Sequence, residues 1–103
     1  MAYEVIITKR AEEEILEIGG YIASNLNAPF AASQLLDDID YQIDSLNMMP
    51  KRHALVSEEH LAERGVRHIP VKNYIIFYEV NDDTQTVEIL SVMYARRNWE
   101  SLL

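Results

Sequence analysis

Tyr74-Ile75-Ile76-Phe77-Tyr78 is an unbroken row of β-branched and aromatic residues, and it is the longest apolar run in the chain. Successive side chains of a strand point to opposite faces, so this run predicts a strand that is covered on both sides. The strand extends over residues 74–81, and similar patterns predict strands over residues 66–71 and 86–94. The short links 72–73 and 82–85 join the three strands into an antiparallel meander. Pro70 cannot donate a ladder hydrogen bond, which marks its strand as an edge strand or a bulged one.

The N-terminal segment predicts a strand followed by an amphipathic helix. Residues 2–7 are rich in β-formers with a period of two. Thr8 is a suitable N-cap for a helix that begins after it. Its apolar stripe consists of Ala11, Ile15, Ile18 and Ile22. Gly19 and Gly20 interrupt this helix at a cost of about 1 kcal/mol each relative to alanine, so we expect another segment to pack closely there.

A second helix is predicted after a short link, residues 24–28. Asn27 is expected to cap it and Pro29 to lie in its first turn. Its apolar stripe is Ala32, Leu35, Leu36, Ile39, Ile43 and Leu46, and its outward acids are Asp37, Asp38, Asp40 and Asp44. The short link favours an antiparallel hairpin of the two helices. Residues 51–62 show no clear period and are expected to form an ordered loop with room for one helical turn, and residues 95–103 a last short helical turn or a tail.

These elements predict an α+β fold in a single domain over residues 1–103: a strand, an antiparallel helix hairpin, and a three-stranded antiparallel meander, in the order β-α-α-β-β-β. A chain of 103 residues with 49% hydrophobic residues fits one core. It has no cysteine, which excludes a disulfide framework and favours a cytoplasmic protein. No apolar run approaches the ~20 residues that span a bilayer, so we expect no contact with a membrane.

The net charge of −8 comes from nine basic and seventeen acidic residues. This balance is opposite to that of a protein that clamps a nucleic-acid backbone. The basic residues of the C-terminal part lie near the ends of its strand-rich region, and they are Arg64, Arg67, Lys72, Arg96 and Arg97. They form either a local basic patch or scattered solubilising charge.

Several kinds of chemistry have no support in the residues. The three glycines do not form a phosphate-binding loop. His53, His60 and His68 lack the spacing of a metal site, and the acidic runs fall on helix surfaces that we expect to be solvated. The sequence therefore predicts neither a cofactor nor a metal.

Three stretches resemble the RelE/ParE superfamily of toxins from bacterial type II toxin–antitoxin systems, and together they cover nearly the whole chain. Residues 3–15 (YEVIITKRAEEEI) look like the family's opening strand and acidic helix, followed by the pair Tyr21-Ile22. Residues 65–80 (GVRHIPVKNYIIFYEV) resemble its arginine-led hairpin with the Asn-Tyr pair. Residues 87–99 (VEILSVMYARRNW) resemble its closing strand and Arg-x-Trp tail.

The resemblance implies one of two activities, because the family contains ParE-like toxins that poison DNA gyrase and RelE-like ribosome-dependent mRNA endonucleases. The nucleases often carry an arginine just after the first tyrosine of the central strand, where this chain has Ile75. Gyrase inhibition, with growth arrest and plasmid stabilisation as its effects, is therefore favoured over an enzymatic activity. One alternative is a nuclease with the reduced catalytic set Arg67, His68, Tyr94 and Arg96, and another is a binding module that has lost its toxicity. The competing interpretation of His68, as a partly exposed edge-strand residue, is the favoured one.

The resemblance also implies a hetero-oligomer with a cognate antitoxin, whose disordered C-terminal segment folds onto the toxin. The expected landing zones are the groove of the helix hairpin and the edge strand that contains Pro70. The residues expected to bind the target, gyrase or the ribosome with its mRNA, are Arg67, Lys72, Tyr94, Arg96, Arg97 and Trp99. The alternative for Trp99 is packing on the sheet, and the alternative for the arginines is pairing with nearby acids.

Overall fold

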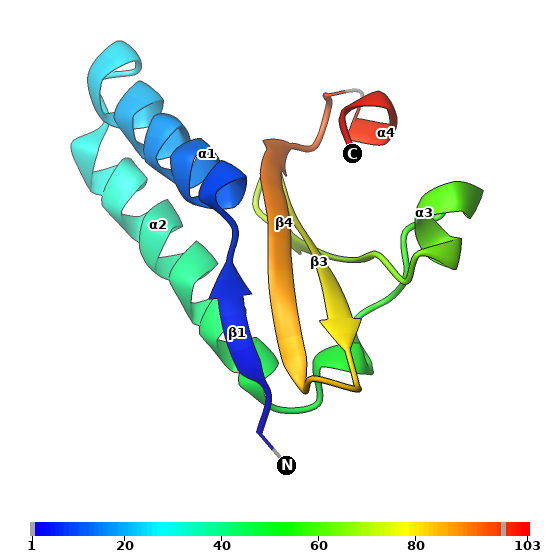
Figure 1. Ribbon diagram of the computed structural model, residues 1–103. Helices are drawn as coiled ribbons and strands as arrows, with labels where there is room; N and C mark the ends of the chain where they lie inside the picture. The colour runs from blue at the N-terminus through cyan, green and yellow to red at the C-terminus, as the bar shows by residue number, and fades with distance from the viewer. Residues whose placement is uncertain (1, 98) are drawn as a thin grey trace.

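The elements of the computed structural model, which describes residues 2–97 and 99–103, follow the predicted order (Figure 1). The strands are β1 (Glu4–Ile7), β2 (Arg67–Val71), β3 (Tyr74–Asn81) and β4 (Thr86–Tyr94). The helices are α1 (Lys9–Gly20), α2 (Pro29–Asp44), α3 (Glu59–Glu63) and α4 (Trp99–Leu102). The predicted loop 51–62 thus contains most of one short helix, α3. None of these helices is long and apolar enough to cross a membrane.

The four strands form one open sheet in the order β1-β4-β3-β2. The meander is antiparallel, as predicted, and β2 with Pro70 lies at one edge. The first strand pairs with the last, β4, in parallel. The α+β class and the order of elements are therefore confirmed, and the parallel pairing of the two ends of the chain is an addition from the structure.

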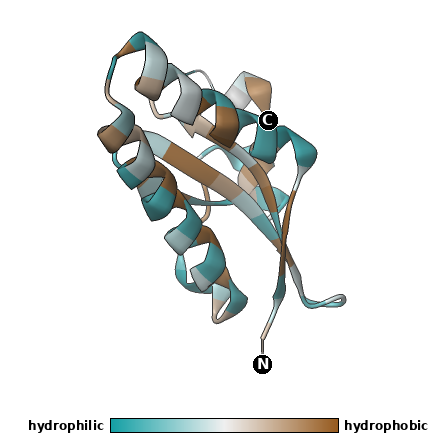
Figure 2. Ribbon diagram, turned by 90° about the vertical axis from the view of Figure 1, so that its left-hand side faces the viewer, coloured by the Kyte–Doolittle hydropathy of each residue, from teal (hydrophilic) through white to brown (hydrophobic). Residues whose placement is uncertain are grey.

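Both faces of β3 are buried. Ile76, Phe77 and Tyr78 are consecutive residues, and each is at most 1% exposed. The helix hairpin α1–α2 covers one face, whereas α3 and α4 lie on the other (Figure 1). Hydrophobic and hydrophilic residues alternate along the helices in Figure 2, as expected of helices that bury only one side.

Two side chains of α1, from its N-cap Thr8 and from Glu14, form hydrogen bonds with β4 where β1 ends. Thr8 caps α1 by accepting from the backbone N–H of Ala11 at 3.2 Å, and its hydroxyl donates to the Ile89 carbonyl at 2.7 Å. One carboxylate oxygen of Glu14 accepts from the Ser91 hydroxyl at 2.7 Å and from the Val92 N–H at 3.2 Å. The strand β4 continues five residues beyond its last pairing with β1, so these polar side chains replace a missing strand partner.

The tip of the hairpin differs from its prediction. After Gly20 the chain forms a π-helical turn, Tyr21–Asn25, closed by a hydrogen bond of 3.2 Å from the Leu26 N–H to the Tyr21 carbonyl. Asn27 does not cap α2, because it adopts φ 50°, and Ala28 precedes the helix without a side-chain cap. Asparagine tolerates this left-handed conformation better than most residues. Pro29 does begin α2, as predicted.

The expected close packing at the glycine pair is confirmed at Gly19 only. A Cβ atom at Gly19 would lie 2.9 Å from Leu36 Cδ1 of α2, whereas a Cβ at Gly20 would meet nothing within 4 Å. The absence of a side chain at Gly19 therefore lets the two helices approach each other.

We predict that Gly19→Val lowers the free energy of unfolding by about 1–3 kcal/mol, because the added methyl groups overpack the contact with α2. Gly20→Val is the matched control, and its change should stay below about 0.5 kcal/mol, because valine is no worse than glycine in a helix. Urea denaturation followed by circular dichroism measures both. Equal losses in the two variants would contradict the close approach at Gly19.

Candidate functional site

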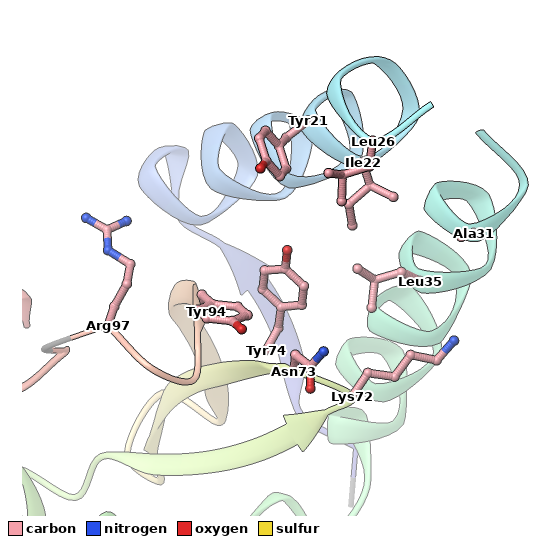
Figure 3. A pocket seen from close by; sticks show the side chains of 10 residues that line it. All are labelled: Tyr21, Ile22, Leu26, Ala31, Leu35, Lys72, Asn73, Tyr74, Tyr94 and Arg97. Atoms are coloured by element: carbon pink, nitrogen blue, oxygen red, sulfur yellow. The ribbon is translucent and has the colours of Figure 1, made fainter. Parts of the chain in front are cut away.

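A groove of about 860 Å³ opens between the tip of the helix hairpin and the end of the sheet. Its volume falls in the range of about 300–1,000 Å³ that is usual for ligand sites. Figure 3 shows side chains from the hairpin and from the sheet pointing toward one another across it. The lining residues are Tyr21, Ile22, Leu26, Ala31, Leu35, Lys72, Asn73, Tyr74, Tyr94 and Arg97.

The π-helical turn shapes the hairpin wall of the groove. In an α-helix, residues five apart are separated by about 1.4 turns and face different directions. The i→i+5 hydrogen bond from Leu26 to Tyr21 stacks these two residues instead, and Ile22 lies beside them. All three side chains therefore reach the same groove.

Tyrosines form the sheet wall. Tyr74, the first residue of β3, and Tyr94, the last residue of β4, are register partners, and their rings meet edge to face with centroids 5.6 Å apart. Burial, and then the nearby Tyr94 and Tyr21, raises the pKa of Tyr74. The Tyr74 hydroxyl therefore stays protonated at neutral pH, and it can donate or accept a hydrogen bond.

Two cations lie at the rim of the groove. Lys72, in the turn between β2 and β3, is 3.6 Å from Asp38 of α2. Arg97 follows β4, and its backbone N–H donates to the Tyr94 carbonyl at 3.0 Å. Within the part of the chain that the structure describes, neither Arg96 nor Arg97 forms an ion pair, and both are exposed. The lining set combines apolar side chains with tyrosines and these two cations, so the groove can bind a segment by apolar burial together with polar contacts.

Arg67 and His68 lie elsewhere. Arg67 pairs with Tyr78, which lies four residues along β3 from Tyr74 of the groove wall. At about 3.3 Å per residue, this places Arg67 about 13 Å from that wall. Its guanidinium donates to the carbonyls of His53 at 2.7 Å and Lys51 at 3.2 Å. Arg67 thus holds the loop that precedes α3 against the sheet.

His68 points to the other face of the sheet, because neighbouring residues of a strand alternate. Its register partner is Phe77 of the smaller core, whereas the partner of Arg67 is Tyr78 of the larger core. The His68 Nδ1 atom is 3.1 Å from the Ala54 carbonyl. The four residues of the reduced nuclease set therefore do not meet in one place.

The phenol of Tyr78 is a structural group. Its hydroxyl donates to the Pro50 carbonyl at 2.6 Å, and burial raises its pKa to about 12, although Arg67 and Arg52 lower it in part. The His53 ring lies edge-on to Tyr78, and its buried Nε2 atom has no hydrogen-bond partner among the residues that the structure describes. Burial, with Arg52 and His68 nearby, lowers the pKa of His53, which favours a neutral ring.

No three His, Asp or Glu residues in 2–97 and 99–103 are grouped to hold a metal.

The outer edge of β2 offers little to a docking strand. Its outward N–H groups are those of alternate residues, and Val66 donates to Leu61 while His68 donates to Ala54. Pro70 has no N–H. Over residues 66–70 the edge therefore has no free N–H donor, and the Val66 carbonyl already accepts from the Val56 N–H at 3.0 Å. Of the two predicted landing zones, the groove is thus the better formed.

Trp99 packs on the sheet, which is the alternative that the sequence left open. Its ring centroid is 5.1 Å from that of Phe77, and it belongs to the smaller core together with Leu103. Arg96 is exposed and does not line the groove.

Of the predicted target-binding residues, Lys72, Tyr94 and Arg97 therefore converge on the groove. Sequence reasoning named the hairpin groove but missed its wall residues, such as Tyr21, Leu26 and Tyr74. Apolar residues beyond the regular helical stripe are the signal that was available for the first two.

Comparison with known proteins gives one family and several related folds. A family model described as "ParE toxin of type II toxin-antitoxin system, parDE" matches residues 5–99. No curated protein matches significantly. The solved chromosomal ParDE TA system from P. aeruginosa is similar with a TM-score of 0.74 and 18% identity, over 92% of this chain and 98% of that chain.

Two further solved structures share the fold. A double arginine-to-alanine mutant of E. coli toxin RelE in the free state aligns with a TM-score of 0.71 and 18% identity, over 99% of this chain and 93% of that chain. The intact E. coli RelBE toxin–antitoxin complex aligns with a TM-score of 0.65 and 19% identity, over 93% of this chain and 100% of that chain.

We predict that Trp99→Ala lowers the free energy of unfolding by about 3 kcal/mol, because it removes a large ring from the smaller core. Leu102→Ala is the control on the same helix, where the side chain is 38% exposed, and its loss should stay below about 1 kcal/mol. Thermal and urea unfolding measure both variants. A Trp99 variant as stable as the wild type would show that the ring is dispensable for packing.

Proposed function

Because the chain belongs to the ParE toxin family of type II toxin–antitoxin systems, we propose that this toxin arrests growth by inhibiting DNA gyrase and that a cognate antitoxin neutralises it. Gyrase inhibition is the activity that the ParE-like branch implies. The alternative is the ribosome-dependent mRNA cleavage of the RelE-like branch, and the fold by itself does not separate the two.

The observation that carries the choice is the separation of the residues that a nuclease would need together. Cleavage by a 2′-oxygen requires a base, a cation over the charged phosphate, and an acid, all at one phosphodiester. Arg67 is bound to backbone carbonyls, His68 is on the opposite face of the sheet, and Tyr94 is about 13 Å further along. This arrangement supports the gyrase branch.

Ile75 supports the same choice. It is half-buried against the smaller core, where the nucleases often carry an arginine. An isoleucine at this position cannot stabilise a phosphate, and loss of one such electrostatic group typically costs about 10²–10³ in rate.

The proposed partner is the antitoxin encoded beside the toxin. The ParDE and RelBE relatives are toxin–antitoxin systems, which supports a partner of the same kind here. We place its toxin-binding segment in the groove, because the groove has an apolar wall and the β2 edge has no free N–H donor over residues 66–70. A segment that orders on binding can cover such a surface.

We predict that the purified toxin inhibits plasmid supercoiling by gyrase at stoichiometric amounts and does not cleave mRNA on translating ribosomes. Supercoiling gels and primer extension measure the two activities in parallel. Toxin mixed with its antitoxin is the control, and it should leave supercoiling intact. Efficient mRNA cleavage would establish the nuclease alternative, and inactivity in both assays combined with normal growth on induction would indicate a binding module without toxicity.

We also predict that the double variant Arg96→Ala, Arg97→Ala loses growth arrest while its stability changes by less than about 1 kcal/mol. Both side chains are exposed and form no ion pair in the described structure, so folding does not depend on them. The control is Lys9→Ala, which removes from the start of α1 an exposed cation that forms no ion pair within the described residues. Wild-type toxicity of the double arginine variant would show that the tail is not part of the target-binding surface.

A further inference from the structure

The two neighbouring arginines of the tail occupy different environments. We propose that Arg97 recognises a carboxylate of the antitoxin segment that fills the groove, and that Arg96 takes no part in this contact. The inference rests on the antitoxin partner given under the proposed function, and it is independent of the identity of the toxin's target.

Backbone hydrogen bonds fix the position of Arg97. The Ala95 N–H donates to the Asn73 carbonyl at 2.8 Å, and the Arg97 N–H returns to the Tyr94 carbonyl at 3.0 Å. The Arg97 carbonyl accepts from the Trp99 N–H at 2.9 Å. A tight turn therefore brings residue 97 back beside Tyr94, and its side chain lies at the rim of the groove, apart from the other lining side chains (Figure 3). Arg96, in the middle of this turn, is exposed and does not line the groove.

Arg97 is also the cation of the groove that has no carboxylate partner in the described structure. Lys72, the other cation, is paired with Asp38. Glu14 and Glu17 line a small crevice together with Arg97, but neither forms an ion pair with it in the described structure. The Glu14 carboxylate instead accepts from Ser91 and Val92 and pairs with Arg10 at 3.7 Å.

The chemistry of the groove specifies the segment that it binds. The tyrosines and Leu26, Ile22 and Leu35 form a wall for apolar side chains, and the planar Arg97 guanidinium at the rim suits bidentate pairing with a carboxylate. The toxin itself carries a net charge of −8, which disfavours an acidic residue of the partner at most other positions. A carboxylate next to an apolar anchor would therefore set the register of the bound segment.

Calorimetric titration of the full-length toxin with the antitoxin encoded beside it tests the inference. We expect Arg97→Ala to raise Kd about ten- to a hundredfold and to reduce the salt dependence of binding, because it removes a charge-assisted contact. Arg96→Ala removes the same charge one residue earlier and should change Kd less than twofold. Arg97→Lys should recover part of the affinity, because it keeps the charge without the planar fork.

Equal losses for the two alanine variants would overturn the inference, since they would show a general effect of charge. An unchanged Kd for Arg97→Ala would overturn it as well. Failure of the wild-type toxin to bind the antitoxin at micromolar concentration would contradict both the proposed partner and this inference. A toxin that binds with the expected asymmetry but does not inhibit gyrase would contradict the proposed target alone.

Discussion

Burial of β3 on both faces is the constraint on which the rest of the structure depends. Ile76, Phe77 and Tyr78 each have almost no exposed surface, although adjacent side chains of a strand point in opposite directions. Burying a large apolar side chain contributes about 1.5–3 kcal/mol, so neither face can be left open to water. The helix hairpin covers one face, and the last part of the chain returns as α4 to cover the other together with α3.

The groove follows from how the hairpin is held against this sheet. Polar contacts from Thr8 and Glu14 fix α1 along β4 where β1 has ended, and the close approach at Gly19 fixes α2 against α1. The tip of the hairpin therefore lies opposite the end of the sheet and leaves a space between them. Side chains from four separate parts of the chain line this space, which gives a partner one continuous surface.

Members of this family share a fold and differ in the chemistry placed on it. In this chain, the positively charged residues of the C-terminal part are used in different ways: Arg64 pairs with Glu79, Arg67 holds a loop, Lys72 pairs with Asp38, and Arg96 and Arg97 remain exposed. These basic residues therefore have different environments. Arg96 and Arg97 are the exposed members of this group that form no ion pair within the described residues.

The sequence by itself determined the four strands, the two long helices and the edge position of β2, because periodicity, Thr8, Pro29 and Pro70 act through neighbours a few residues away. The family was indicated separately, by the resemblance of residues 3–15, 65–80 and 87–99. Only the tertiary structure decided the parallel pairing of β1 with β4 and the separation of Arg67 from Tyr94, and it also revealed the π-helical turn at Tyr21. The turn is closed by a local hydrogen bond from Leu26, whereas the pairing and the separation depend on contacts between residues that are far apart in the chain. No local pattern encodes such contacts, because they are stabilised by the packing of whole elements against one another.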